Sequence, residues 1–290
     1  MQLSIEHVTK KFGEKTAVDD ISVELNEGVY GILGANGSGK TTLMRMLASV
    51  SRPTSGSIKL DGEEIFELDH EYRDLIGYLP QHVGYYKTFS AEKFLLYIAA
   101  LKGLEKDVAK KKVAELLTLV GLEENRKGKI GKFSGGMKRR VGIAQALLND
   151  PKILIVDEPT AGLDPKERIR FRNLLSQIAT DRIVLLSTHI VSDIEFIAKE
   201  VLIMKAGRVV QKETPQALLG GIQDKVWSVS AAETEIPHFQ SLYKVGNISR
   251  DEDQFRLRIL SDSQPHPNAK NERPNLEDLY LYYFDEEAAG

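Results

Sequence analysis

The stretch Gly34-Ala35-Asn36-Gly37-Ser38-Gly39-Lys40-Thr41 constrains this chain more than any other. It matches the pattern G-x-x-x-x-G-K-[ST] at every fixed position. An apolar run at 29–33 leads directly into it, and helical periodicity follows over 41–49. A glycine-rich loop between a strand and a helix turns backbone N–H groups and the positive end of the helix dipole toward phosphate. The sequence therefore predicts a phosphate-binding loop within an α/β fold.

Two further segments point to the same chemistry. Ser134-Gly135-Gly136 opens the helical stretch 137–148, where a serine cap and two glycines permit close approach of phosphate to the backbone. The apolar run 153–156 ends in Asp157 and Glu158, and α/β sheets place ligand-binding groups at such strand ends. Phosphoryl transfer needs a metal to neutralise charge and a carboxylate within reach of the nucleophile. Asp157 and Glu158 are candidates for these two tasks.

These three features, in this order, resemble the nucleotide-binding subunit of an ATP-binding-cassette (ABC) protein, over the chain up to about residue 220. The resemblance implies a P-loop NTPase fold with a mostly parallel sheet, antiparallel N-terminal strands and a helical insertion. It also implies ATP and Mg²⁺ as cofactors, and hydrolysis of ATP to ADP and phosphate.

The resemblance also assigns residues to the site. The nucleotide-binding positions are Phe12, Gly34, Asn36, Gly37, Ser38, Gly39, Lys40, Thr41, Thr42, Ser134, Gly135, Gly136 and Asp164. The metal-binding positions are Thr41, Gln81 and Asp157, and the catalytic positions are Glu158, His189 and Gln81. In this scheme Glu158 deprotonates the attacking water and His189 contacts the γ-phosphate. Phe12 either stacks on adenine, where tyrosine is commoner, or belongs to the core.

The second phosphate-binding segment departs from the usual family form, which starts with leucine and ends with glutamine. Phe133 and Met137 stand at those places, and we expect Met137 to pack rather than to contact nucleotide. One nucleotide cannot easily reach both phosphate-binding segments of a single chain. The family solves this by facing two subunits head to tail, so the resemblance implies a second ABC subunit, either an identical chain or a paralogue.

Composition sets the domain expectations. The 290 residues contain no cysteine, and 28% of them are charged, which is typical of a globular protein in a reducing compartment. The net charge of −3 does not indicate nucleic-acid binding. Acidic residues gather after the glycine pair 220–221. We therefore expect an ABC domain over 1–220, with a helical subdomain at about 82–150, and a small α+β extension over 221–290. Within the extension we expect strands at 226–230 and 254–260 and a helix from Asn275.

The function that fits best is the ATPase subunit of an ABC transporter, which drives export through a separate integral membrane permease. The chain is expected in the cytoplasm, held at the inner face of the membrane through that permease. Tyr85, Tyr86 and Phe89 follow Gln81, in a stretch that helps receive a permease helix in the family; burial within the domain is the alternative. The alternative function is a soluble ABC ATPase acting in cofactor assembly, translation or DNA maintenance.

Overall fold

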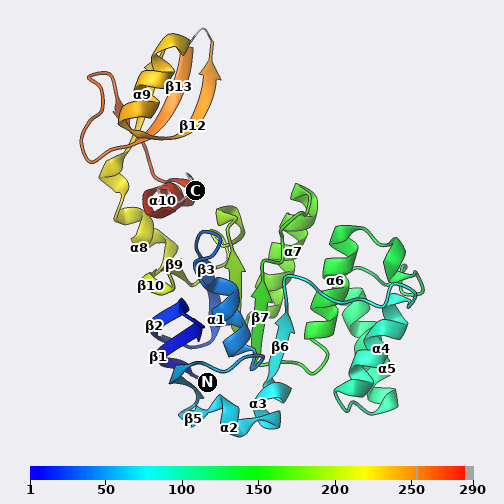
Figure 1. The fold of residues 1–290 in the computed structure, drawn as a ribbon. Coiled ribbons are helices and arrows are strands. Elements are labelled where there is room, and N and C mark those ends of the chain that lie inside the picture. Colours follow the sequence, from blue (N-terminus) through cyan, green and yellow to red (C-terminus); the bar gives the residue numbers. More distant parts are fainter. Residues whose placement is uncertain (253, 285–290) are drawn as a thin grey trace. The chain divides into compact units, whose positions relative to one another are not determined.

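The computed structural model describes residues 1–252 and 254–284. The chain forms two compact units, unit 1 (Met1–Gln211) and unit 2 (Lys212–Gly290), which are shown in Figure 1. Residues 253 and 285–290 of the expected extension lie outside the described residues.

The first sheet of unit 1 is formed by strands near the start of the chain. Its order is β2-β1-β4-β5, and neighbouring strands are antiparallel. The bounds are β1 (Leu3–Phe12), β2 (Lys15–Leu25), β4 (Ser55–Leu60) and β5 (Glu63–Glu64). β1 and β2 form a hairpin whose turn contains Gly13 at φ +58°, a conformation that glycine adopts without strain. Phe12 therefore lies at the end of this hairpin.

The second sheet of unit 1 carries the phosphate-binding loop. Its order is β10-β9-β3-β8-β7-β6, and the neighbours from β9 to β6 are parallel. The bounds are β3 (Gly28–Leu33), β6 (Ile76–Leu79), β7 (Ile153–Asp157), β8 (Ile183–Thr188), β9 (Glu200–Lys205) and β10 (Arg208–Glu213). Every residue of β7 and β8 is buried, as expected for central strands of a sheet covered on both faces. The carboxyl ends of these strands lie along one edge, which places the site there.

Helices cover the sheets, and the chain segment that connects β6 to β7 forms a separate helical group to one side of the sheet (Figure 1). α1 (Lys40–Leu47) follows the phosphate-binding loop and buries Leu43, Met44 and Leu47 in the core that both sheets share. The helical group consists of α4 (Ala91–Leu101), α5 (Lys106–Leu119) and α6 (Gly135–Ala146), which contact one another. The other helices of unit 1 are α2 (Ile65–Leu68), α3 (His70–Leu75), α7 (Pro165–Ile178) and the 3-10 turns η1 (Ile130–Lys132) and η2 (Val191–Asp193). This mixed α/β architecture confirms the predicted fold class.

Unit 2 is a small α+β unit with its own core. Its antiparallel sheet has the order β12-β13-β11-β14. The bounds are α8 (Pro215–Gly220), η3 (Gln223–Lys225), β11 (Val226–Ala231), η4 (Glu233–Glu235), α9 (Ile236–Leu242), β12 (Lys244–Asp251), β13 (Gln254–Leu260), β14 (Lys270–Asn271) and α10 (Leu276–Phe284). Val229, Leu257 and Ile259 are buried together with Phe239 of α9.

The division between the units comes earlier than the glycine pair at 220–221. It lies between Gln211 and Lys212, near the end of β10. α8 contacts α10 and belongs to unit 2. In residues 1–252 and 254–284, no helix has both the length and the apolar character needed to cross a bilayer.

Candidate functional site

The phosphate-binding loop connects β3 to α1, and its glycines are required by its path. Gly37 and Gly39 have φ of +82° and +102°, in the region that favours glycine. A Cβ on Gly39 would lie 2.3 Å from the backbone oxygen of Ala17, and one on Gly34 would lie 2.5 Å from Ser38 Oγ. The loop is thus packed too closely for side chains at these two positions. Ser38, also within the loop, is buried.

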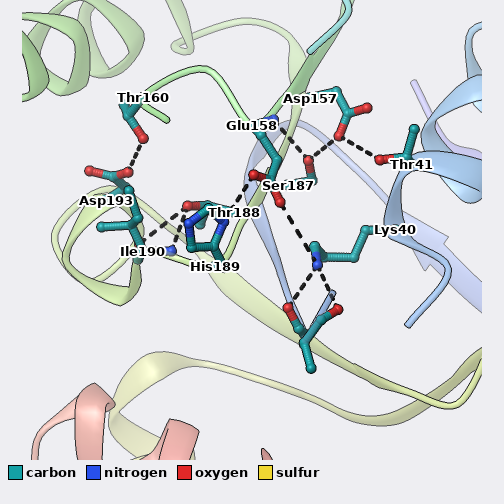
Figure 2. A network of polar contacts seen from close by, with 12 residues as sticks. Lys40, Thr41, Asp157, Glu158, Thr160, Ser187, Thr188, His189, Ile190 and Asp193 are labelled. Carbon is teal, nitrogen blue, oxygen red and sulfur yellow. Dashed lines mark hydrogen bonds and ion pairs between the residues drawn. The ribbon is translucent and has the colours of Figure 1, made fainter. Parts of the chain in front are cut away.

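Lys40 turns its side chain back over this loop. Its ammonium donates to the backbone oxygens of Gly34 at 2.7 Å and Ala35 at 3.0 Å, and lies 3.9 Å from Glu158 Oε1. Burial lowers the pKa of Lys40, while the carboxylates of Glu158 and Asp157 oppose that shift. The loop therefore holds a buried cation beside the candidate catalytic carboxylate, as Figure 2 shows.

A second set of contacts joins α1 to the ends of β7 and β8. Thr41 Oγ1 lies 3.3 Å from Asp157 Oδ1, and the Ser187 hydroxyl donates to the same oxygen at 2.5 Å. The other oxygen, Asp157 Oδ2, is buried, and no donor in the described part of the chain reaches it. A buried carboxylate oxygen that lacks a donor, beside a threonine hydroxyl, fits a hard cation such as Mg²⁺, which prefers oxygen ligands.

Glu158 lies at the centre of the arrangement. His189 Nδ1 is 2.9 Å from Glu158 Oε2, so the carboxylate lies between this imidazole and the Lys40 ammonium (Figure 2). The backbone N–H of Glu158 donates to Ser187, to its carbonyl at 3.1 Å and its hydroxyl at 3.0 Å. Glu158 has φ of +44°, a strained value for a residue with a side chain that persists only where the surroundings fix it.

The segments that follow Glu158 and His189 are tied to each other. The Thr160 hydroxyl donates to Asp193 Oδ2, and both side chains are buried. Burial raises the pKa of Asp193, and the hydrogen bond from Thr160 opposes that rise. This contact (Figure 2) links the end of β7 to the turn after β8.

A cleft of about 370 Å³ opens over the loop. Its lining includes these predicted site residues: Phe12, Asn36, Gly37, Gly39, Lys40, Thr41, Thr42, Gln81 and Glu158. The Phe12 side chain is exposed, and the Lys10 ammonium lies 5.2 Å from its ring centroid. An exposed ring at the cleft is available for stacking, so the structure does not place Phe12 in the core.

The remaining predicted residues do not line this cleft. Ser134 caps α6, where its hydroxyl accepts from the Met137 N–H at 3.2 Å, and Gly135 is exposed. A Cβ on Gly136 would lie 2.7 Å from Glu167 Oε2. Asp164 caps α7 by accepting from the Glu167 N–H at 2.9 Å. The second phosphate-binding segment is therefore presented at the start of α6, apart from the first.

Two residues that sequence reasoning missed hold the site together. Ser187 contacts both the Asp157 carboxylate and the Glu158 backbone. Arg139 of α6 donates to main-chain oxygens that include that of Glu158. The position of Ser187, two residues before His189, was a usable signal. Arg139 gave none, because its partners are distant in sequence and are backbone atoms.

Comparisons with known proteins agree with this geometry. A family model described as "ABC transporter" matches residues 18–161. The chain is 43% identical over 232 residues to the uncharacterized ABC transporter ATP-binding protein YxlF of Bacillus subtilis, which covers 80% of this chain and 77% of that protein. It is 33% identical to the linearmycin resistance ATP-binding protein LnrL of the same organism, over 96% of this chain and 97% of that protein.

Solved structures show the same likeness. A structure described as the ATP-binding subunit of an ABC transporter superposes with a TM-score of 0.68 at 26% identity, over 76% of this chain and 93% of the other. The cassette MJ0796, solved as a dimer in a post-hydrolysis state with ADP and Pi, superposes with a TM-score of 0.66 at 27% identity, over 73% of this chain and 98% of the other. The chain therefore belongs to the family of ABC transporter ATP-binding proteins, and it carries the ATP-binding and ATP-hydrolysing domain of that family.

Proposed function

We propose that this chain is the ATPase subunit of an ABC exporter, and that Glu158 is the general base of its reaction. The observation that carries this assignment is the position of the Glu158 carboxylate at the cleft, between Lys40 Nζ at 3.9 Å and His189 Nδ1 at 2.9 Å. A carboxylate held there can accept the proton of an attacking water. His189 orients the carboxylate and reaches toward the γ-phosphate.

The other residues of the site bind and orient the nucleotide. Phe12 stacks on adenine, and the N–H groups of the loop that ends at Lys40 hold the β- and γ-phosphates. Thr41, Gln81 and Asp157 hold Mg²⁺, which when bound neutralises phosphate charge. The unpartnered Asp157 Oδ2 supports this ligand set.

The arrangement of the two phosphate-binding segments supports a dimer. The start of α6, with Ser134, Gly135 and Gly136, does not line the cleft that contains Lys40. We propose that it meets the nucleotide of a second ABC subunit, identical or paralogous, and that Asp164 lies in the loop that faces this partner. MJ0796, a related cassette, was solved as a dimer.

The names of the relatives support the transporter assignment over the soluble alternative. They include the bacitracin transport protein BcrA of Bacillus licheniformis, 40% identical over 71% of this chain and 67% of that protein, and a Nod factor export protein of Burkholderia orbicola. We propose that a separate membrane permease is the partner and that this chain works at the cytoplasmic face of the membrane. We propose no nucleic-acid partner for this chain.

Replacing Glu158 with Gln tests the general base. The amide keeps the shape of the side chain but cannot accept the proton, so we expect Mg²⁺-dependent turnover to fall by about 10²-fold or more. ATP then remains bound, and size-exclusion chromatography with ATP is expected to show an accumulated dimer. Glu67→Gln, at an exposed position on α2, is the control. Turnover of Glu158→Gln near that of the control would rule out the assignment.

A further inference from the structure

Arg139 of α6 uses its whole guanidinium to hold the backbone beside the site. Its Nε donates to the oxygen of Pro159 at 2.6 Å. Nη1 donates to Pro80 at 3.1 Å and Gln81 at 3.0 Å, while Nη2 donates to Asp157 at 3.2 Å and also to Glu158. A guanidinium has five N–H donors, and here each one meets a main-chain carbonyl.

These carbonyls belong to two segments that carry the proposed chemistry. Pro80 and Gln81 follow β6, and the other three residues span the end of β7. β6 and β7 are parallel neighbours in the sheet, so both segments leave the same edge. The Arg139 side chain lies between them and fixes one relative to the other. It also holds the carbonyl of Glu158, the residue whose backbone has the strained φ of +44°.

We propose that Arg139 is a positioning residue for ATP hydrolysis. From α6, the helix that Ser134 caps, it fixes the Glu158 carboxylate and Gln81 relative to each other. The inference rests on the proposed roles of Glu158 and Gln81. Arg139 does not touch nucleotide in this scheme; it acts through the backbone of Glu158, the proposed base, and of Gln81, a proposed Mg²⁺ ligand. Because α6 begins with the second phosphate-binding segment, the same helix joins that segment to the catalytic carboxylate of its own chain.

A lysine cannot replace these contacts. Its ammonium is a single point with three donors, whereas the planar fork of arginine reaches carbonyls on both segments at once. Arg139→Lys keeps the positive charge and loses the geometry, and Arg139→Gln loses both. If the fork positions the site, then both variants lose activity and charge alone does not rescue it.

The test measures ATPase kinetics, ATP-analogue binding and thermal unfolding of both variants. We expect kcat to fall by about 10²-fold, the effect of a small misplacement of reacting groups, with KM for ATP and analogue binding unchanged. Lys138→Gln, the adjacent residue on α6, removes a positive charge and is expected to retain wild-type kcat. A kcat of Arg139→Lys or Arg139→Gln equal to that of Lys138→Gln would overturn the proposal. So would variants that have lost nucleotide binding or the folded state, because Arg139 would then support the fold rather than the site.

A double variant separates this proposal from the assignment of Glu158. If Arg139 acts mainly through the Glu158 carboxylate, then Arg139→Gln lowers the residual turnover of Glu158→Gln by much less than the roughly 10²-fold expected in the wild-type background, because effects within one functional unit do not add. Full additivity would overturn the positioning role while leaving Glu158 as the base. Normal turnover of Glu158→Gln alone would instead refute the proposed function.

Discussion

Gly39 and Gly37 belong to the same loop, and both have positive φ, yet they differ in what surrounds them. A Cβ on Gly39 would lie 2.3 Å from the backbone oxygen of Ala17, in β2, whereas a Cβ on Gly37 would have no heavy atom within 4 Å among the described residues. The loop therefore touches the neighbouring sheet at Gly39 and is open at Gly37. This contact joins the phosphate-binding loop to the hairpin that carries Phe12.

This difference predicts unequal costs for alanine in the protein without nucleotide. Gly37→Ala is expected to cost about 1–2 kcal/mol of unfolding free energy, the cost of a left-handed backbone. Gly39→Ala adds a clash with a rigid backbone atom, worth about 1–3 kcal/mol more. Urea unfolding followed by circular dichroism measures both. Equal destabilisation by the two variants would show that the contact with Ala17 is not tight in solution.

Residues with short-range signals were predictable, and residues with long-range partners were not. Lys40, Thr41 and Glu158 stand in local patterns, a loop before a helix and an acidic strand end, so their placement in the cleft or beside it followed from sequence spacing. Arg139 meets Pro80 and Pro159, which are 59 and 20 residues away. Every residue has a main-chain carbonyl, so the residue types at those positions cannot indicate that their carbonyls bind an arginine.

At the scale of elements, apolar runs predicted the central strands of unit 1, and unit 2 was harder. β11 and β13 alternate in polarity and were expected. β12 and α9 were not, because β12 is mostly exposed and α9 is short. The sequence also did not predict the contact that holds α10 in place. Asp278 is buried and accepts from Arg258 through both carboxylate oxygens at 2.7 Å. Asp278 and Asn275 also exchange side chain–backbone hydrogen bonds that begin the helix.

Removing Arg258 is expected to destabilise unit 2 strongly. Arg258→Met leaves the Asp278 carboxylate, 4% exposed, without its counter-charge, which costs about 3–5 kcal/mol for a buried pair. Arg256→Met, on the same strand, breaks only an exposed pair with Asp251 and should cost about 1 kcal/mol or less.

The measurement is denaturant unfolding of the full chain followed by Trp227 fluorescence. Trp227 is the single tryptophan of the sequence and lies on β11, so its signal reports on unit 2. Adding Asp278→Asn to Arg258→Met should recover part of the loss, because it removes the uncompensated charge. Similar midpoints for the two arginine variants would contradict the importance of this ion pair.

At the scale of the whole molecule, the aromatic residues that follow Gln81 fall into two parts, one that packs within unit 1 and one that is exposed. The Tyr85 hydroxyl donates to the Lys138 oxygen at 2.7 Å, and its ring contacts Phe94, so Tyr85 packs within unit 1. Tyr86 is 49% exposed and stacks on Phe89 with centroids 5.0 Å apart. Tyr97 packs edge-on against Tyr86. The exposed part of this group is the surface that we propose for the permease.

Docking is therefore expected to depend on Tyr86 and Phe89. Replacing both with Ser removes aromatic area from the proposed contact, so recovery of the chain with the membrane fraction is expected to drop while ATP binding persists. Leu242→Ser, at an exposed apolar position of unit 2, is the control. Membrane recovery equal to that control would refute this surface. Co-purification of the wild-type chain with ribosomes rather than membranes would favour the soluble alternative.

The contacts of Arg139 have a consequence for how such sites change over evolution. Any residue at positions 80, 81 or 157–159 presents the same main-chain oxygen, so the guanidinium places no demand on the identity of its neighbours. The proposed chemistry restricts the side chains at positions 81, 157 and 158, but a substitution at any of the five positions needs no compensating change at position 139. The contact therefore depends on the identity of one residue, Arg139, and on no other side chain. A search for correlated substitutions among relatives would not detect it.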